Sequence, residues 1–195
     1  MNKPTMGIDI DGTLTEFDSF IPYFNELLGK QIKPEEIIQY DLHEIFDMEY
    51  DTFSALFDEH SAPIYEQSIP RPSAQDQLKW IEEHFNIVYI TARLEEFEEL
   101  TSKWIKDHGF PVSPIVCTGS HDKIGAIKEY NVSYMVEDRL ENALHIWEEL
   151  QIPVYLLDTP YNQAELPSGV YRVKDWYEVT EHLKQNHWTK DPQHK

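Results

Sequence analysis

Short runs of β-branched and aromatic residues alternate along the chain with stretches that repeat apolar residues at helical spacing. Such alternation is typical of a parallel sheet whose strands are joined by helices. Most of the runs are continuously apolar, as expected for strands that helices cover on both faces. We therefore predict an α/β fold with a Rossmann-like parallel sheet. The predicted strands are Met6–Ile10, Ile87–Thr91, Ile115–Cys117, Ser133–Val136, Val154–Leu157 and Val170–Val173.

Three stripes of apolar residues at helical spacing lie between these strands. The first stripe follows Pro72, which is favoured in the first turn of a helix. Gly109 ends the second stripe and is suited to cap a helix at its C-terminus. The tryptophans within the stripes are expected to pack in the core and do not require a cofactor. The three stripes run from Ala74 to Phe85, from Leu94 to Ile105 and from Leu140 to Leu150.

One interval is too long for a simple crossover. About 75 residues separate Asp11 from the next predicted strand, whereas a strand–helix–strand crossover needs only about a dozen. The intervening residues carry many aromatics at helical spacing, which predicts a small helical unit that forms a lid over the first strand. The aromatics could equally form only the core of that unit. The predicted domains are a catalytic core of residues 1–15 and 71–186, a helical cap of residues 16–70 and a flexible tail of residues 187–195.

The composition limits the kinds of molecule that this chain is expected to bind. The chain has 36 acidic and 16 basic residues and a net charge of −20, which disfavours binding to nucleic-acid polymers and to anionic membranes. A small anion can still bind where a metal and one or two basic side chains reverse the sign locally. Cys117 is the single cysteine, so no intramolecular disulfide is expected. Without a signal-like or membrane-spanning apolar run, we expect a cytoplasmic protein. The sequence sets no oligomeric state.

Two carboxylates follow the first predicted strand. Asp9 and Asp11 stand two residues apart and precede Gly12 and Thr13. Residues i and i+2 of a strand share a face, so both carboxylates would point the same way if the strand continues to Asp11. Carboxylates this close repel each other unless a cation lies between them or one is protonated. The pair predicts a Mg²⁺ site combined with a nucleophile and a general acid. The alternative is an ordinary Asp-Gly turn at the end of a strand.

Polar and charged residues also follow the next three predicted strands. Ligands of open parallel sheets bind at the carboxyl ends of the strands, so these residues are expected to meet in one site. That site would combine carboxylates, hydroxyls and basic groups. The segments are Thr91-Ala92-Arg93, Asp122-Lys123 and Glu137-Asp138-Arg139.

In this order the motifs resemble those of the haloacid dehalogenase (HAD)-like superfamily of phosphohydrolases. The resemblance covers about 135 residues of the predicted core, and the insertion lies where that family places its first cap. It implies a phosphoric monoester hydrolase that uses Mg²⁺ and an aspartyl-phosphate intermediate. The four motifs that carry it are Asp9-Ile10-Asp11-Gly12-Thr13, Thr91, Lys123 and Glu137-Asp138.

The chemistry of such a site can be assigned to residue types. Asp9 would attack phosphorus and form the aspartyl phosphate. Asp11 would first protonate the leaving oxygen and then take a proton from the attacking water. Thr91 and Lys123 would stabilise the phosphoryl oxygens. Carboxylate oxygens of Asp9 and Asp138, with the backbone carbonyl of Asp11, would hold Mg²⁺.

Several of these residues have other interpretations. Thr91 and Asp138 could each act only as a helix cap. Lys128 is an alternative to Lys123 as the phosphate-binding lysine, but Lys123 begins its predicted helix whereas Lys128 would lie inside it.

The roles of two further residues stay open. Glu137 departs from the paired aspartates, or Gly-Asp, that are often found in the fourth motif of this superfamily. Arg93 could clamp the phosphate or substrate, or it could pair with the Glu95-Glu96 run.

Within the superfamily, the chain is similar to the 5′(3′)-deoxyribonucleotidases and the bacterial nucleotidase-like proteins grouped with them. That family places a phenylalanine eight residues beyond the nucleophile, where it stacks on the substrate base, and Phe17 holds this position here. Asp122-Lys123 and the length of the cap, about 55 residues, are similar as well. The resemblance implies a nucleotidase for (deoxy)nucleoside monophosphates; Phe17 could also be simple cap packing. The expected substrate-binding residues are Gly12, Phe17, Ala92 and Arg93.

Other functions use similar motifs. A phosphosugar phosphatase or phosphomutase would differ mainly in the cap. A phospho-acceptor signalling domain also places Asp, Thr and Lys at strand ends, but such domains are shorter and have no cap. The cap contains thirteen acidic residues against Lys30 and Lys33, and this charge favours a monophosphate ester over a polyphosphate.

Overall fold

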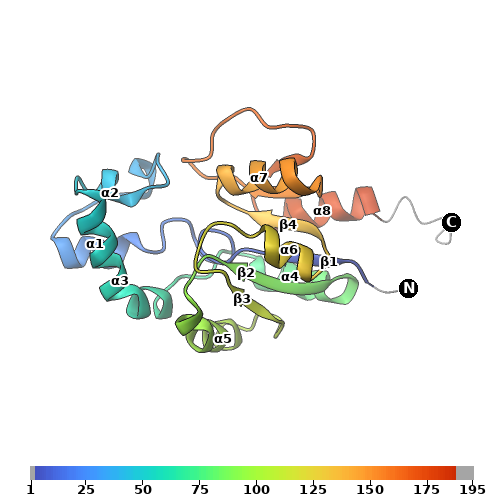
Figure 1. Cartoon of the computed structure of the whole chain (residues 1–195), viewed down its shortest axis with the longest axis horizontal. Helices are drawn as coiled ribbons and strands as arrows, with labels where there is room; N and C mark the ends of the chain where they lie inside the picture. Colours follow the sequence, from blue (N-terminus) through green and yellow to red (C-terminus); the bar gives the residue numbers. More distant parts are fainter. Residues whose placement is uncertain (1–2, 188–195) are drawn as a thin grey trace.

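A six-stranded parallel sheet forms the centre of the protein. The computed structural model describes residues 3–187, and the strands lie in the order β3-β2-β1-β4-β5-β6. Figure 1 labels β3, β2, β1 and β4 of this sheet, with the helices around it. The chain builds outward from β1 to β3 and then returns to the other side of β1. The carboxyl ends of β1 and β4 therefore lie next to each other at the point where the order reverses, which is where such sheets bind ligands. The strands are β1 Thr5–Ile8, β2 Asn86–Thr91, β3 Ile115–Cys117, β4 Val132–Glu137, β5 Val154–Leu157 and β6 Val170–Val173.

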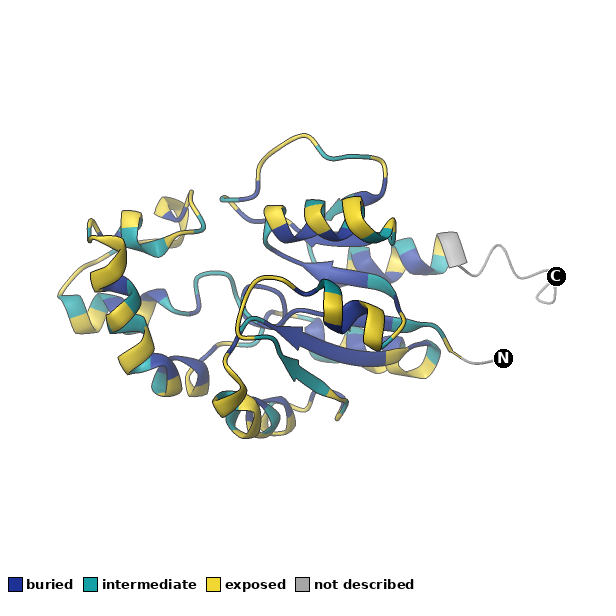
Figure 2. Cartoon of the chain, in the orientation of Figure 1, coloured by how far each residue is buried: buried dark blue, intermediate teal, exposed yellow. Residues whose placement is uncertain are grey.

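Helices cover both faces of this sheet, which explains why the strands are mostly apolar. Tyr89 belongs to the apolar cluster under α4, α5 and α8, whereas its neighbours Val88 and Ile90 belong to the cluster under α6 and α7. Figure 2 shows the central strands largely buried, the edge strand β3 half-buried and the helices exposed on their outer sides. The predicted α/β class is confirmed. The helices are α4 Ala74–His84, α5 Glu98–Asp107, α6 Ile124–Glu129, α7 Leu140–Leu150 and α8 Trp176–His187, with a 3₁₀ turn, η2, at Glu95–Phe97.

Residues 16–70, which we call the cap, fold beside the sheet as a group of helices with an apolar cluster of their own. The rings of Phe24, Phe46 and Phe53 meet in that cluster at centroid distances of 4.8–5.8 Å. The separation of the chain into core and cap stays a prediction. The cap contains α1 Ile21–Leu28, η1 Pro34–Glu36, α2 Leu42–Ile45 and α3 Tyr50–Glu66.

The two segments that connect the cap to the core run antiparallel to each other. Thr15 pairs with Pro70 in an isolated bridge. The backbone N–H of Glu16 donates to the carbonyl of Ile69 (2.8 Å), and that of Arg71 donates to the carbonyl of Leu14 (2.7 Å). We call this pair of segments the neck.

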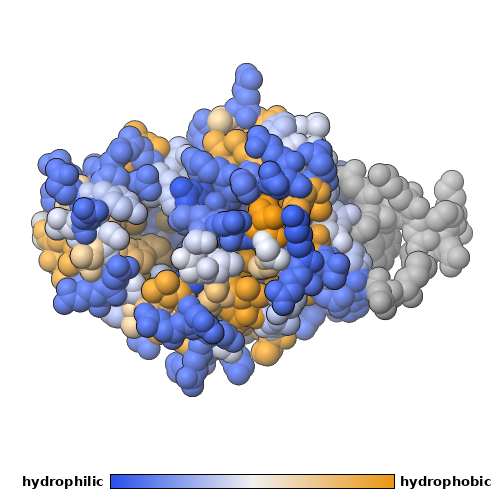
Figure 3. All heavy atoms as spheres, viewed as in Figure 1, coloured by the Kyte–Doolittle hydropathy of each residue, from blue (hydrophilic) through white to orange (hydrophobic). Residues whose placement is uncertain are grey.

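The described helices and strands depart from the prediction in a few places. Strand β1 ends at Ile8 and not at Ile10, and Leu94 is exposed at the start of the second predicted stripe. Helix α8 includes His187, the first residue of the predicted tail, and residues 188–195 lie outside the described residues. No helix among residues 3–187 is long and apolar enough to cross a membrane. Hydrophilic side chains cover most of the face in Figure 3, in keeping with the excess of acidic residues.

Candidate active site

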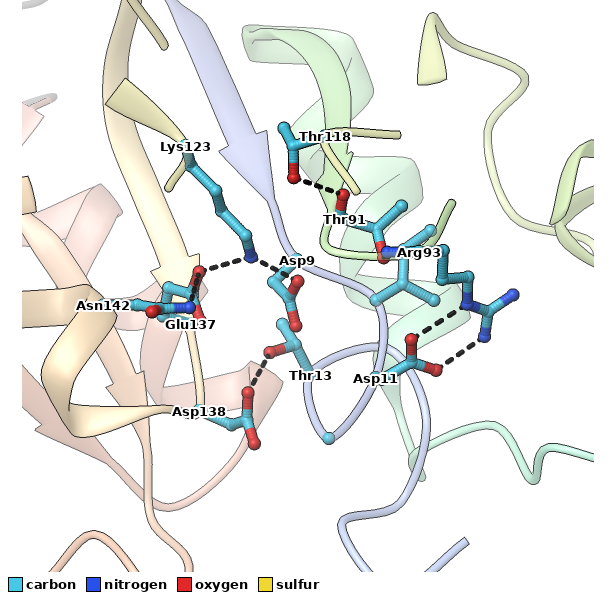
Figure 4. Close-up of polar contacts among 12 residues, drawn as sticks. Asp9, Asp11, Thr13, Thr91, Arg93, Thr118, Lys123, Glu137, Asp138 and Asn142 are labelled. Carbon is cyan, nitrogen blue, oxygen red and sulfur yellow. Dashed lines mark hydrogen bonds and ion pairs between the residues drawn. The ribbon is translucent and has the colours of Figure 1, made fainter. Parts of the chain in front are cut away.

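The chain turns sharply as soon as β1 ends. The Asp9 N–H still donates to the Val136 carbonyl (3.0 Å), but the Ile10 carbonyl then accepts the N–H groups of the next turn. Asp9 and Asp11 therefore do not share a strand face. Their carboxylates point apart, to Lys123 and to Arg93 respectively (Figure 4). The sequence predicted a shared face only if the strand continues to Asp11, and β1 ends at Ile8.

Lys123 is a buried cation beside Asp9. It precedes the first turn of α6, its side chain is 1% exposed, and its Nζ contacts Asp9 and donates to Glu137 Oε1 at 2.5 Å. Burial lowers the pKa of Lys123, but the carboxylates of Asp9 and Glu137 outweigh this and raise it above its ordinary value. Lys128 lies on the exposed side of α6. The geometry thus places Lys123, and not Lys128, beside the candidate nucleophile.

Three buried carboxylates converge around Lys123. Oxygens of Asp9, Glu137 and Asp138 all lie within 4.8 Å of one another. Burial and the neighbouring carboxylates raise the pKa of Asp9, and burial together with Glu137 raises that of Asp138 to about 7. Lys123 touches two of the three carboxylates and leaves the buried Glu137 Oε2 without a hydrogen-bond partner. An all-oxygen donor set of this kind fits Mg²⁺.

Gly12 allows the turn after β1 to approach the fourth strand. Its φ is +80°, a left-handed conformation that glycine adopts at little cost. A Cβ at this position would lie 2.2 Å from Asp138 Oδ2. The next residue, Thr13, donates from Oγ1 to Asp138 Oδ1 at 3.4 Å. The turn is therefore packed directly against the carboxylate of Asp138.

Replacing Gly12 with alanine is expected to weaken Mg²⁺ binding at least tenfold, because the new methyl group must displace the Asp138 carboxylate. The left-handed backbone adds strain of about 1–2 kcal/mol for a non-glycine residue. Isothermal titration with Mg²⁺ measures the first effect and urea unfolding the second. Gly109→Ala is a matched control, since Gly109 also has a positive φ (+69°) but has no heavy atom within 4 Å of its would-be Cβ. Equal Mg²⁺ affinity in the two variants would contradict the prediction.

The segment after β2 supplies a hydroxyl and a second basic group. Thr91 is fully buried at the pocket and its Oγ1 accepts the backbone N–H of Arg93 at 3.3 Å. Ala92 lines the pocket beside it. The guanidinium of Arg93 binds the carboxylate of Asp11 through two hydrogen bonds, of 2.9 and 2.6 Å, instead of pairing with the Glu95-Glu96 run.

A pocket of about 310 Å³ lies between the cap and the carboxyl ends of the strands. Asp9, Lys123 and Asp138 line its core side, and aromatic side chains of the cap line the other. Phe17 is one of these, and its ring lies 6.1 Å from that of Tyr161. The predicted lid region therefore lies over the predicted catalytic residues.

Sequence reasoning missed the residues that follow β5. The hydroxyl of Tyr161 donates to Asp138 Oδ2, and the Asn162 side chain donates to the carbonyls of Asp138 and Leu157, both at 2.7 Å. The sequence could have revealed these residues, because β5 was predicted as a strand of the parallel sheet. The carboxyl end of β5 lies beside that of β4, so the residues after it lie near the site. Arg71, which donates to the Gly12 carbonyl at 2.7 Å, was also missed and carries no local signal.

Comparison with known proteins identifies the family. The model of the family "5′ nucleotidase, deoxy (Pyrimidine), cytosolic type C protein" matches residues 3–187. A protein of Halalkalibacterium halodurans with the provisional name nucleotidase BH1399 is 38% identical over 175 residues, which is 89% of each chain. A 5′(3′)-deoxyribonucleotidase of Clostridium acetobutylicum is 28% identical over 185 residues, 92% of this chain and 94% of that protein.

Solved structures support the same fold. The magnesium-bound HAD-hydrolase YfnB of Bacillus subtilis superimposes with a TM-score of 0.63 at 15% identity, covering 94% of this chain and 99% of that one. At this identity the likeness speaks for the fold alone. The sequence-based resemblance to the deoxyribonucleotidases and the bacterial nucleotidase-like proteins is confirmed by the family match and by the relative of 38% identity. The chain belongs to the 5′ nucleotidase, deoxy (pyrimidine), cytosolic type C family and is a phosphoric monoester hydrolase.

Proposed function

We propose that this nucleotidase hydrolyses (deoxy)nucleoside monophosphates with Mg²⁺ and through an aspartyl phosphate on Asp9. The observation that carries the proposal is the buried Asp9 carboxylate, in contact with Lys123 on the core side of a pocket whose other side is aromatic. A nucleophile beside a fixed cation suits a phosphoryl group, and aromatic rings suit a nucleobase.

The first step transfers the phosphoryl group to Asp9. Oδ1 of Asp9 contacts Lys123, so Oδ2 is the oxygen that attacks phosphorus in line with the ester oxygen. The P–O bond to the nucleoside breaks as the new bond to Asp9 forms, and Asp11 gives its proton to the leaving oxygen. Lys123 and Thr91 stabilise the charge on the phosphoryl oxygens.

The second step releases phosphate. Asp11, now ionised, takes a proton from a water molecule, and the resulting oxygen attacks phosphorus and displaces the carboxylate of Asp9. Asp9, Asp138 and the backbone carbonyl of Asp11 would hold Mg²⁺, which when bound neutralises charge on the phosphoryl group. Glu137 keeps Lys123 in place through its 2.5 Å contact.

A substrate panel tests the proposal. We would measure phosphate release from ribo- and deoxyribonucleoside monophosphates and from sugar phosphates, with Mg²⁺ or with EDTA. Mg²⁺-dependent release biased to nucleotides is the expected result. Release biased to sugar phosphates would keep the mechanism and discard the nucleotide substrate. Transfer of phosphate to Asp9 from a small donor, with no ester hydrolysed, would indicate a signalling domain.

Replacing Phe17 with alanine is expected to raise KM for nucleotides about tenfold or more, because stacking of one base on an aromatic ring contributes about 1–3 kcal/mol. The KM for p-nitrophenyl phosphate, which has no base, should change much less. Phe17→Tyr keeps the ring and should restore nucleotide binding. An equal effect of Phe17→Ala on both substrates would mean that Phe17 serves only to pack the cap.

A further inference from the structure

Arg93 is held in a site of its own beneath the cap. Its side chain is 1% exposed, and its three nitrogens all have partners: Nε and Nη2 donate to the two oxygens of Asp11, and Nη1 donates to Thr101 Oγ1 at 3.1 Å. The guanidinium carbon lies 3.9 Å from the centre of the Tyr65 ring. Tyr65 belongs to α3 of the cap, whereas the other partners belong to the core.

The two hydrogen bonds from Arg93 fix the Asp11 carboxylate in one orientation. Asp11 stands on the turn after β1, and its side chain is 23% exposed toward the pocket. A planar guanidinium that binds both carboxylate oxygens sets the position of the group and also its rotation. Thr101 anchors the guanidinium on α5 and the Tyr65 ring covers its face, so Arg93 has no room to follow a displaced Asp11.

We infer that Arg93 is a positioning residue, which sets the place and rotation of the Asp11 carboxylate and links both to the cap through Tyr65. The inference rests on the proposed function, because it requires Asp11 to be the acid that protonates the leaving oxygen. The sequence led us to expect that Arg93 binds the substrate. We now infer that Arg93 binds Asp11 and not the substrate phosphate.

A second arginine provides a matched control. The guanidinium carbon of Arg139 lies 4.3 Å from the ring centre of Tyr40, which is also a cap residue. The carboxylate that Arg139 contacts is the exposed Glu141, at 3.3 Å. Loss of Arg139 therefore removes one contact between core and cap, as loss of Arg93 does, but leaves Asp11 in place.

The experiment compares two leaving groups. The ratio kcat/KM reports the steps up to formation of the aspartyl phosphate, in which the leaving group departs. A nucleoside must be protonated as it leaves, whereas p-nitrophenolate is a stable anion. For Arg93→Met we expect kcat/KM on a nucleoside monophosphate to fall about 10²-fold, the scale of a small misplacement of a catalytic group, and on p-nitrophenyl phosphate by only a few-fold. Arg93→Lys keeps the positive charge but cannot bind both carboxylate oxygens at once. Its kcat/KM on the nucleoside monophosphate should lie between those of Arg93→Met and wild type.

The control variants distinguish an error in the proposed role of Asp11 from an error in the inference about Arg93. Arg139→Met should lower kcat/KM by the same factor on both substrates. Asp11→Asn should lower kcat/KM much more on the nucleoside monophosphate than on p-nitrophenyl phosphate, a difference that we call the leaving-group dependence. If Asp11→Asn lacks it, the proposed role of Asp11 is wrong. If Asp11→Asn shows it and Arg93→Met lowers both substrates equally, the inference about Arg93 is overturned while the proposed function stands.

A pair of cap variants keeps the test valid if Arg93→Met does not fold. Tyr65→Leu removes the ring over the guanidinium, whereas Tyr65→Phe keeps it. Tyr65→Leu should show the leaving-group dependence and Tyr65→Phe should keep the wild-type ratio between the substrates. The same ratio in both variants would contradict the link to the cap.

Discussion

Asp9→Asn is expected to lower kcat by roughly four to six orders of magnitude, the scale seen when a covalent nucleophile is removed. The amide cannot form the acyl phosphate, and the nearby Asp11 is turned toward Arg93 and cannot replace it. Phosphate release under saturating Mg²⁺ measures the loss. In wild-type enzyme quenched with acid during turnover, mass spectrometry should find the phosphate on the peptide that contains Asp9.

The same variant should remain folded. Burial already disfavours the ionised Asp9 carboxylate, whose pKa is raised, so a neutral amide of nearly the same shape removes a cost. We expect a free energy of unfolding without metal that is equal to or above that of wild type. Activity close to wild type would show that Asp9 is not the nucleophile, and loss of folding would show that its charge is needed to balance Lys123.

Lys123→Met is expected to lower both activity and stability. Lys123 is the cation that touches two of the three buried carboxylates. Removal of one partner from a buried ion pair typically costs about 3–5 kcal/mol, because the remaining charges are left uncompensated. Urea unfolding should show this loss near neutral pH. The loss should shrink as the pH falls, because protonation of Asp138, with its pKa of about 7, and of Asp9 removes the repulsion.

Lys128→Met is the control for this prediction. Lys128 lies five residues further along, on the exposed side of α6. Its replacement should change stability by no more than about 0.5 kcal/mol, as is usual at exposed positions, and should leave phosphate release intact. A larger loss of activity in Lys128→Met than in Lys123→Met would reverse the assignment of the phosphate-binding lysine.

The strands of this protein could be predicted because their local signal agrees with their burial. The runs 87–90 and Val154–Leu157 are continuously apolar, and both faces of the sheet are indeed covered. The end of β1 was predicted two residues too late. Ile10 is as apolar as a strand residue, but its backbone carbonyl closes the turn that Gly12 allows, and the strand pattern does not contain this information.

The candidate site could be predicted at the level of strand ends but not of side-chain partners. Each of the four expected motifs lies at or next to the pocket because the sheet is parallel. The partner of Asp11 is Arg93, 82 residues away in the chain. Local reasoning offered only the substrate phosphate or the nearby Glu95 and Glu96 as partners of Arg93, and left the choice between them open. Such a pairing is determined by the way α5 and the cap pack, and one sequence carries no direct record of it.

The neck has a consequence for the way new variants of this protein could arise. The chain leaves the core after Thr15 and returns at Pro70, and these two residues pair in an antiparallel bridge whose hydrogen bonds join the residues on either side of them. A segment whose two ends are adjacent can be lengthened, shortened or exchanged without re-routing the chain through the sheet. The order of the six strands would be unaffected, and so would the segments that follow them. Selection could thus change the molecules that are admitted to the site by exchanging one contiguous stretch of the gene, provided that the new stretch again covers Arg93 as Tyr65 does.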